Sequence, residues 1–217
     1  MTTSIGRIVL RVALGAAVAA GALLAGCASL RGTLPQEEGL HPRLTRYTYL
    51  ERGSLVALAA DVSATLQRED KAYIPVGIGV ANIGLPSLTL TRESFTLVDE
   101  EGRRYPMAGV GEVRAELGGL MKYDLRLSFT FAEVFATGYQ GWRQVPSVFF
   151  PLQDAEIDSL FSRRNVVRDN VTLPRATWMV DVIYFPHPEG EITGRRFELW
   201  MKTPELEEPI FVKFAVK

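Results

Sequence analysis

With 24 basic and 25 acidic residues among 217, the chain has a formal net charge of −1. This charge gives no electrostatic case for nucleic-acid binding, because domains that bind nucleic acid present a basic face. Hydrophobic residues make up 47% of the chain, enough for a packed core and too many for a disordered polypeptide. Cys27 is the single cysteine, so no intramolecular disulfide can brace the fold.

The first 26 residues have the layout of an export signal. Arg7 and Arg11 give a positively charged start, and an apolar run from Val12 to Leu24 follows. This run is shorter than the roughly 20 apolar residues that a membrane-spanning helix needs. We therefore interpret residues 1–26 as a cleaved signal peptide, with an uncleaved signal anchor as the alternative.

The end of this leader, Leu24-Ala25-Gly26-Cys27, resembles the lipobox of bacterial lipoproteins. The resemblance implies cleavage between Gly26 and Cys27 and acylation of the Cys27 thiol, with palmitate among the attached chains. Two or more acyl chains hold a protein on a membrane stably. In lipoproteins of bacteria with two membranes, an aspartate after the cysteine signals retention at the inner membrane. Ala28 at that position favours the periplasmic face of the outer membrane.

The segment after Cys27 is typical of a linker. Residues 27–46 contain two glycines and two prolines with little apolar periodicity, which predicts a lipidated N-terminus followed by a flexible tether. From residue 47 to residue 217 the pattern becomes that of strands, so we expect one domain there.

Alternating apolar residues predict most of the strands. In the run from Tyr73 to Ile83, four branched residues fall on one face and small residues on the other, which indicates a strand with one buried face. Phe95–Val98 and Arg103–Tyr105 flank Asp99-Glu100-Glu101-Gly102 and predict a hairpin in which Gly102 adopts a positive φ. Further alternating runs occupy residues 123–131, 178–184, 197–201 and 210–216.

Two segments have helical spacing. Val113, Leu117, Leu120 and Met121 lie on one helical face, although Gly118 and Gly119 weaken the pattern. Residues 151–164 begin with a proline and carry a small apolar stripe, as a short helix does. Many short strands with turn signals between them predict a sandwich or a barrel.

Two stretches, Tyr73–Tyr105 and Val180–Gly190, resemble a family of immunoglobulin-like domains of unknown function found in bacterial lipoproteins and secreted proteins. The shared features are the apolar strand ending in Asn82, the Phe95–Asp99 run with its Gly102–Tyr105 return, and the Pro188-Glu189-Gly190 exit turn. The resemblance implies an all-β, immunoglobulin-like β-sandwich. Residues from about 107 to 170 depart from the family pattern and form a long insertion, which we expect to carry one or two short helices.

Candidate catalytic and metal-binding residues are few. Asp99, Glu100 and Glu101 are interpreted as a solvated turn, with a calcium site as the alternative. His41 and His187 are the only histidines, too few for a zinc site or for a convincing Ser-His-Asp triad. The arginine pairs at 103–104, 163–164 and 195–196 are expected to be solvated. We therefore predict no catalytic residue, no metal and no cofactor.

The most suggestive feature outside the expected core is the aromatic-rich span Phe129–Phe150. Aromatic residues separated by glycine and proline can line an interface, and the candidate interaction surface is Tyr139, Trp142, Phe149 and Phe150. Packing within the insertion is the alternative, and the one we favour.

These observations predict a lipid-anchored, non-enzymatic protein of the cell envelope that binds a protein partner or supports an assembly. A carrier of a small ligand or lipid with an apolar pocket is the first alternative. A hydrolase of unrecognised type is the second.

Overall fold

The computed structural model describes residues 44–146, 149 and 169–217. The leader, the lipobox and the predicted tether up to residue 43 lie outside the described residues, as do Phe150 and the helix predicted at 151–164. Within the described part of the chain, no helix is both long and apolar enough to cross a bilayer.

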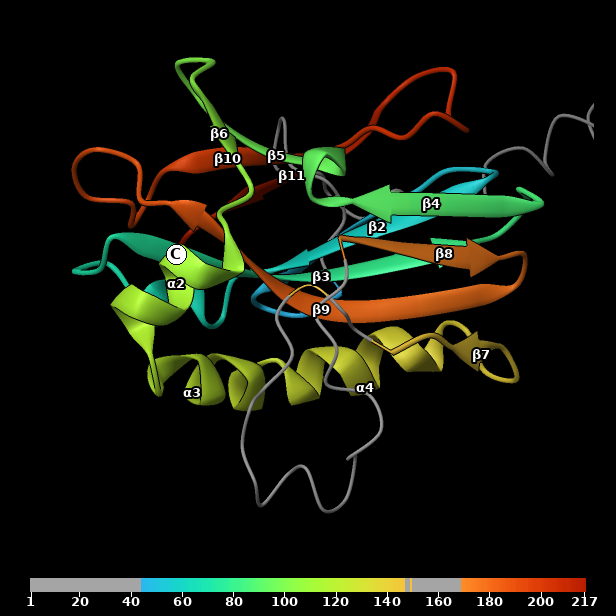
Figure 1. Cartoon of the computed structure of the whole chain (residues 1–217), viewed down its shortest axis with the longest axis horizontal. Helices are drawn as coiled ribbons and strands as arrows, with labels where there is room; N and C mark the ends of the chain where they lie inside the picture. The colour runs from blue at the N-terminus through green and yellow to red at the C-terminus, as the bar shows by residue number, and fades with distance from the viewer. Residues whose placement is uncertain (1–43, 147–148, 150–168) are drawn as a thin grey trace, which may run out of the picture. The chain divides into compact units, whose positions relative to one another are not determined.

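The described strands form three sheets (Figure 1). Neighbouring strands are antiparallel except for β7 and β9, which run parallel. The first sheet has the order β1 (Thr48–Arg52), β2 (Val56–Asp61), β3 (Tyr73–Asn82), β9 (Thr177–Pro186), β7 (Arg143–Gln144). The second has the order β11 (Ile210–Ala215), β10 (Arg196–Met201), β5 (Phe95–Asp99), β6 (Arg104–Pro106). The third pairs β4 (Ser87–Thr91) with β8 (Asn170–Pro174).

The main hydrophobic core joins these sheets. Residues from β2, β3 and β9 bury their side chains in one cluster with residues from β5, β10 and β11. At the edge of the core, the hydroxyl of Tyr49 on β1 donates to the carbonyl oxygen of Ala215 on β11, at 3.0 Å. The predicted fold class, an all-β sandwich with a helical insertion, is confirmed, and so are the strands predicted around residues 178–184, 197–201 and 210–216.

The insertion contributes three α-helices among the described residues: α2 (Val110–Leu117), α3 (Leu120–Leu127) and α4 (Phe129–Thr137). Two short 3-10 helices, η1 (Thr65–Gln67) and η2 (Arg92–Ser94), lie elsewhere. The helical pattern at 113–121 is confirmed. The helix is interrupted at the two glycines that weaken the pattern, because Gly118 has φ +48° and ends α2.

The strand predicted at residues 123–131 is wrong, because this segment forms α3 and the start of α4. The buried positions are Met121, Asp124, Ser128, Phe131 and Phe135, at helical spacings of three and four. Two of these buried side chains are polar, so the helical period is hidden in a pattern read from hydrophobicity alone.

Strand β3 is buried on both faces, where the sequence pattern indicated one. The face with Gly77, Gly79 and Ala81 is covered by α4, whose Phe131 and Phe135 pack against it. A Cβ at Gly79 would lie 2.8 Å from the ring of Phe135. The glycine and alanine residues on this face of β3 therefore leave room for the aromatic side chains of α4. Figure 1 shows α3 and α4 running beside β9 along this sheet.

Candidate functional site

The predicted hairpin is confirmed as β5 and β6, and its turn holds the chain's three consecutive acids. Gly102 supplies the positive φ, at +80°. Asp99 ends β5 with a buried side chain, and its Oδ1 accepts hydrogen bonds from the backbone N–H groups of Glu101 (3.1 Å) and Arg103 (2.8 Å). The carboxylate therefore closes its own turn.

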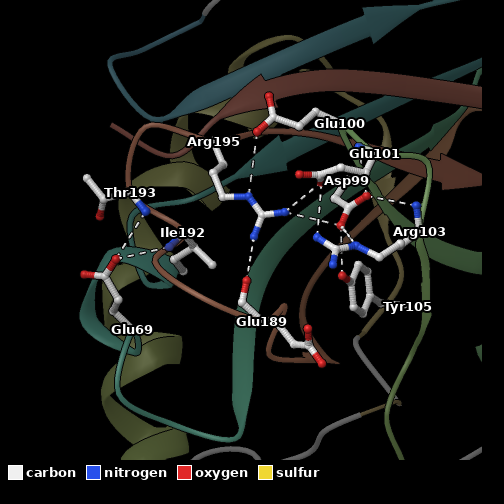
Figure 2. Close-up of polar contacts among 10 residues, drawn as sticks. All are labelled: Glu69, Asp99, Glu100, Glu101, Arg103, Tyr105, Glu189, Ile192, Thr193 and Arg195. Atoms are coloured by element: carbon white, nitrogen blue, oxygen red, sulfur yellow. Dashed lines mark hydrogen bonds and ion pairs between the residues drawn. The ribbon is translucent and has the colours of Figure 1, made fainter.

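The second oxygen of Asp99 collects three side-chain donors, all drawn in Figure 2. Oδ2 lies 2.7 Å from Nε of Arg103, 2.9 Å from the hydroxyl of Tyr105 and 3.3 Å from Nη2 of Arg195. Burial alone would raise the pKa of Asp99, but the hydrogen bonds from Arg103 and Tyr105 outweigh it and lower the pKa to about 2. Asp99 is thus ionised at neutral pH and cannot act there as a general acid.

Arg195 ties this turn to the loop between β9 and β10. Its guanidinium lies 3.0 Å from Oε2 of Glu101 and 3.8 Å from Oε1 of Glu100, and it donates to the carbonyl oxygen of Glu189 at 3.0 Å. Its Cζ also lies 5.4 Å from the ring centroid of Phe197. Only 14% of the Arg195 side chain is exposed, so this arginine is a structural cross-link.

Glu69 holds the same loop from the other side. Its Oε1 accepts from the backbone N–H groups of Ile192 and Thr193, each at 3.2 Å, as Figure 2 shows. The hydrogen bond from the Thr193 backbone lowers the pKa of Glu69. The β9–β10 loop is therefore fixed at two points, Glu69 and Arg195.

This network bears on the calcium alternative. Both oxygens of Asp99 are occupied by protein donors, and Glu100 and Glu101 face Arg195. Across the residues that the structure describes, no three His, Cys, Asp or Glu side chains converge in a metal-binding arrangement. The turn is a folded ion-pair network in which arginines, a tyrosine hydroxyl and backbone N–H groups surround Asp99.

A groove of about 390 Å³ lies beside the turn, on the outer side of the β5–β10–β11 sheet. Val98 contributes an apolar wall, and the charged side chains Glu100, Arg196, Glu198 and Lys213 surround it. Nζ of Lys213 pairs with Oε1 of Glu198 at 3.1 Å. Arg196 also lines the groove and is exposed, and no ion pair joins it to another residue in the described ranges.

An aromatic pair continues this sheet face. Trp200 and Phe211 are cross-strand neighbours with ring centroids 4.6 Å apart and an interplanar angle of 19°. Arg104 and Lys213 lie over the two rings, at 5.9 and 5.6 Å from the centroids. Nε1 of Trp200 donates to Glu198 at 2.8 Å, so the pair and the groove share one polar network.

The residues predicted as an interaction surface are mostly internal. Tyr139 is 5% exposed and packs between Phe135 (4.9 Å between centroids) and Trp142 (5.2 Å), which is half-buried. Phe149 is fully buried against Phe95. Phe150 lies outside the described residues. Tyr139 and Phe149 are buried side chains, as the packing alternative predicts, whereas Trp142 keeps part of its surface exposed.

Sequence reasoning missed two sets of residues. Arg103 and Arg195 were expected to be solvated but pair with buried Asp99; the available signal was an acid four residues before an arginine across a predicted turn. The alternating run at 123–131 predicts that Tyr123, Leu127 and Phe129 share one face of a strand, but they are exposed residues of α3 and α4. The predicted lipidation residue Cys27 and the cleavage position Gly26 lie outside the described residues.

Comparison with known proteins adds little to this geometry. No family model matches the chain, and no curated protein matches it. Among solved structures, the crystal structure of the yjhA protein from Bacillus subtilis aligns over 77% of this chain and 96% of its own, at 9% identity and a TM-score of 0.37. At that score, the similarity supports no inference about fold or function.

Proposed function

We propose that this protein is a lipid-anchored component of the bacterial cell envelope whose β-sandwich domain works by binding a protein partner. The lipobox pattern Leu24–Cys27 supports the anchor, and Ala28 favours the outer membrane. The anchor would place the domain at the periplasmic face, where a partner in the envelope is within reach.

The observation that carries the binding role is the groove beside the acidic turn. It combines an apolar wall, Val98, with the guanidinium of Arg196, which no described residue pairs. A guanidinium binds a carboxylate with two parallel hydrogen bonds, and an apolar wall binds an adjacent side chain. The occupant that fits is a short segment of a protein partner carrying an apolar residue next to an aspartate, a glutamate or a C-terminal carboxylate.

The pKa of Asp99 favours a binding role over general acid catalysis at this turn. General acid–base chemistry needs a group whose pKa lies near the working pH. Asp99 has a pKa of about 2 and is held by two arginines, so it would fix the shape of the groove while remaining ionised.

Photo-crosslinking in intact cells tests this role. A photo-reactive residue replaces Glu100 at the groove, and in a second chain it replaces Arg175, which is exposed in the turn between β8 and β9. We expect a discrete, protease-sensitive cross-linked band from position 100 and none from position 175.

Charge reversal tests whether Arg196 binds the partner. Each substitution is made in the chain that carries the photo-reactive residue at position 100. Arg196→Glu should abolish the band from position 100, because it places a carboxylate opposite the carboxylate of the partner. Arg175→Glu, the matched exposed control, should leave the band unchanged. A band that persists in Arg196→Glu, or the absence of any band from position 100, would overturn the proposed binding site.

A further inference from the structure

The two arginine pairs beside the acidic turn divide in the same way. Arg103 and Arg195 turn toward the buried Asp99, and their guanidinium nitrogens lie 2.7 and 3.3 Å from its Oδ2. Their successors, Arg104 and Arg196, begin β6 and β10 and are exposed. Neighbouring side chains of an extended chain point to opposite sides, so the turn takes one guanidinium of each pair and the other stays on the surface.

Strand register places both exposed arginines on the outer face of the second sheet. Arg104 on β6 is paired with Val98 on β5, and Val98 is paired with Glu198 on β10. Arg196 stands two residues before Glu198 on the same strand and therefore shares its face. Phe197, between them, is buried in the core on the opposite face. Arg104 and Arg196 thus project from one surface, with Val98 between them.

The spacing of the two arginines follows from the geometry of the sheet. Arg104 and Arg196 are two strands and two residues apart. With about 4.8 Å between strands and about 3.3 Å per residue, their Cα atoms lie about 12 Å from each other. Cζ of Arg104 lies 5.9 Å from the ring centroid of Trp200, which holds this guanidinium over the sheet face. We call Arg104, Val98, Trp200 and Arg196 the two-arginine surface.

The acids near this surface already have partners. Glu198 accepts a hydrogen bond from Nε1 of Trp200 at 2.8 Å and pairs with Nζ of Lys213 at 3.1 Å. Glu100 lies 3.8 Å from Nε of Arg195. In the part of the chain that the structure describes, no ion pair joins either exposed arginine to an acid. The two-arginine surface therefore carries two positive charges with an apolar side chain between them.

This pattern favours a protein segment over a polyanion as the occupant. Glu100 and Glu198 lie close to the path between the arginines, and they would repel the unbroken negative charge of a nucleic acid or a lipid headgroup layer. Separate carboxylates avoid this repulsion, since each can meet one guanidinium through two parallel hydrogen bonds. Val98 and the half-buried Trp200 add a contact that an apolar side chain fills.

We propose that the partner binds the two-arginine surface through an extended acidic segment with two carboxylates, one on Arg196 and one on Arg104. This inference rests on the proposed function and names the chemistry of its partner. An extended chain advances about 3.3 Å per residue, so residues four apart point to the same side about 13 Å from each other. The segment should therefore carry an aspartate or glutamate at positions i and i+4, with an apolar residue at i+2 over Val98.

A second photo-reactive position tests how far the contact extends. Pro106 is exposed and stands two residues after Arg104 on the same face of β6, an edge strand. A photo-reactive residue at position 106 should capture the same partner as the one at position 100, because a segment that reaches Arg104 comes close to both positions. A partner captured from position 100 alone would contradict the extended segment.

Charge variants in the full-length chain with the photo-reactive residue at position 100 test Arg104 directly. Arg104→Glu should weaken the cross-linked band several-fold, and Arg104→Gln should weaken it less, because only the first variant adds repulsion. Arg143→Glu, at an exposed arginine of β7 in the other large sheet, should leave the band unchanged. Both arginines are exposed, so the variants should fold, and thermal unfolding of each variant checks this.

The cross-linked peptide of the partner, sequenced by mass spectrometry, completes the test. We expect two acidic residues four apart around an apolar residue, and replacing each acid in turn by arginine should restore the band with Arg104→Glu for one of them. A band that Arg104→Glu leaves unchanged, or a cross-linked peptide without the paired acids, would overturn this inference and leave the proposed binding site at the groove intact. The absence of any band from position 100 in the otherwise unaltered chain would contradict both.

Discussion

Asp99 is the residue on which the acidic turn depends. Its two oxygens receive backbone donors from the turn and side-chain donors from Arg103, Tyr105 and Arg195. The ionised form makes all of these contacts, which is why the pKa falls to about 2 in the folded chain. A carboxylate with a lowered pKa stabilises the fold above its unfolded pKa, and the stabilisation is lost as the pH falls toward the folded pKa.

Asp99→Asn should therefore lower the free energy of unfolding by about 2 kcal/mol at pH 7, the cost of losing charge-assisted hydrogen bonds at a buried site. The difference between the wild type and the variant should persist down to about pH 4 and shrink between pH 4 and pH 2. Urea unfolding across this pH range measures it.

Glu100→Gln serves as the control for Asp99→Asn. Glu100 lies 3.8 Å from Arg195 with a half-exposed side chain, and such pairs contribute little. A difference between Asp99→Asn and the wild type that is unchanged at pH 2 would show that the ionised carboxylate is not the stabilising species.

At the scale of elements, the packing of α4 on the sheet depends on two glycines of β3, Gly77 and Gly79. Gly79 leaves room for the ring of Phe135, and Phe131 reaches within 3.4 Å of the Cβ position of Gly77. Because cores are close-packed, a single added methyl group at this contact must displace the ring or the helix.

Gly79→Ala should destabilise the fold by about 1–3 kcal/mol through overpacking. Gly111→Ala on α2 is the matched control: its Cβ meets nothing within 4 Å, and alanine in a helix should raise stability by up to about 1 kcal/mol. Thermal unfolding of both variants compares them. A neutral Gly79→Ala would mean that α4 does not rest on this face of β3.

A second contact fixes α3. Asp124 is fully buried, 2.5 Å from Nη2 of Arg68, and accepts a hydrogen bond from the hydroxyl of Tyr184 at 3.1 Å. Burial raises the pKa of Asp124, and the charge of Arg68 and the Tyr184 hydrogen bond offset only part of that rise. The ion pair therefore specifies where α3 docks at a net cost of desolvation.

Asp124→Leu should cost about 3–5 kcal/mol, because it leaves the guanidinium of Arg68 buried without its partner. Adding Arg68→Met should recover most of that loss, since the second substitution removes the unpaired charge. Chemical denaturation of the single and double variants measures the coupling. Additive losses in the double variant would contradict a direct Arg68–Asp124 interaction.

Local sequence signals predict some of these elements, whereas contacts between residues distant in sequence determine others. The β5–β6 hairpin could be predicted, since Gly102 and the flanking alternation are local signals. The rotation of α3 could not, because Asp124 is a polar residue at a buried position, and its partner Arg68 is distant in sequence. The link between Asp99 and Arg195 is similarly non-local, and it depends on the loop after β9 folding back on the turn.

For the whole molecule, the proposed function separates the anchor from the binding surface. The groove beside the acidic turn lies on the β5–β10–β11 sheet, and helices of the insertion cover the other large sheet. A domain anchored at residue 27 would present this groove to a protein partner in the envelope. The place where it meets that partner depends on the modification of a single residue, Cys27.

The chemical state of the mature N-terminus tests that dependence most directly. Mass spectrometry of the N-terminal peptide from membranes of the native host, with metabolic labelling by a palmitate analogue, measures it. We predict a chain that begins at an acylated Cys27, with the label lost in Cys27→Ser. A mature chain that begins upstream of residue 27, or one that carries a free Cys27 thiol, would contradict the account.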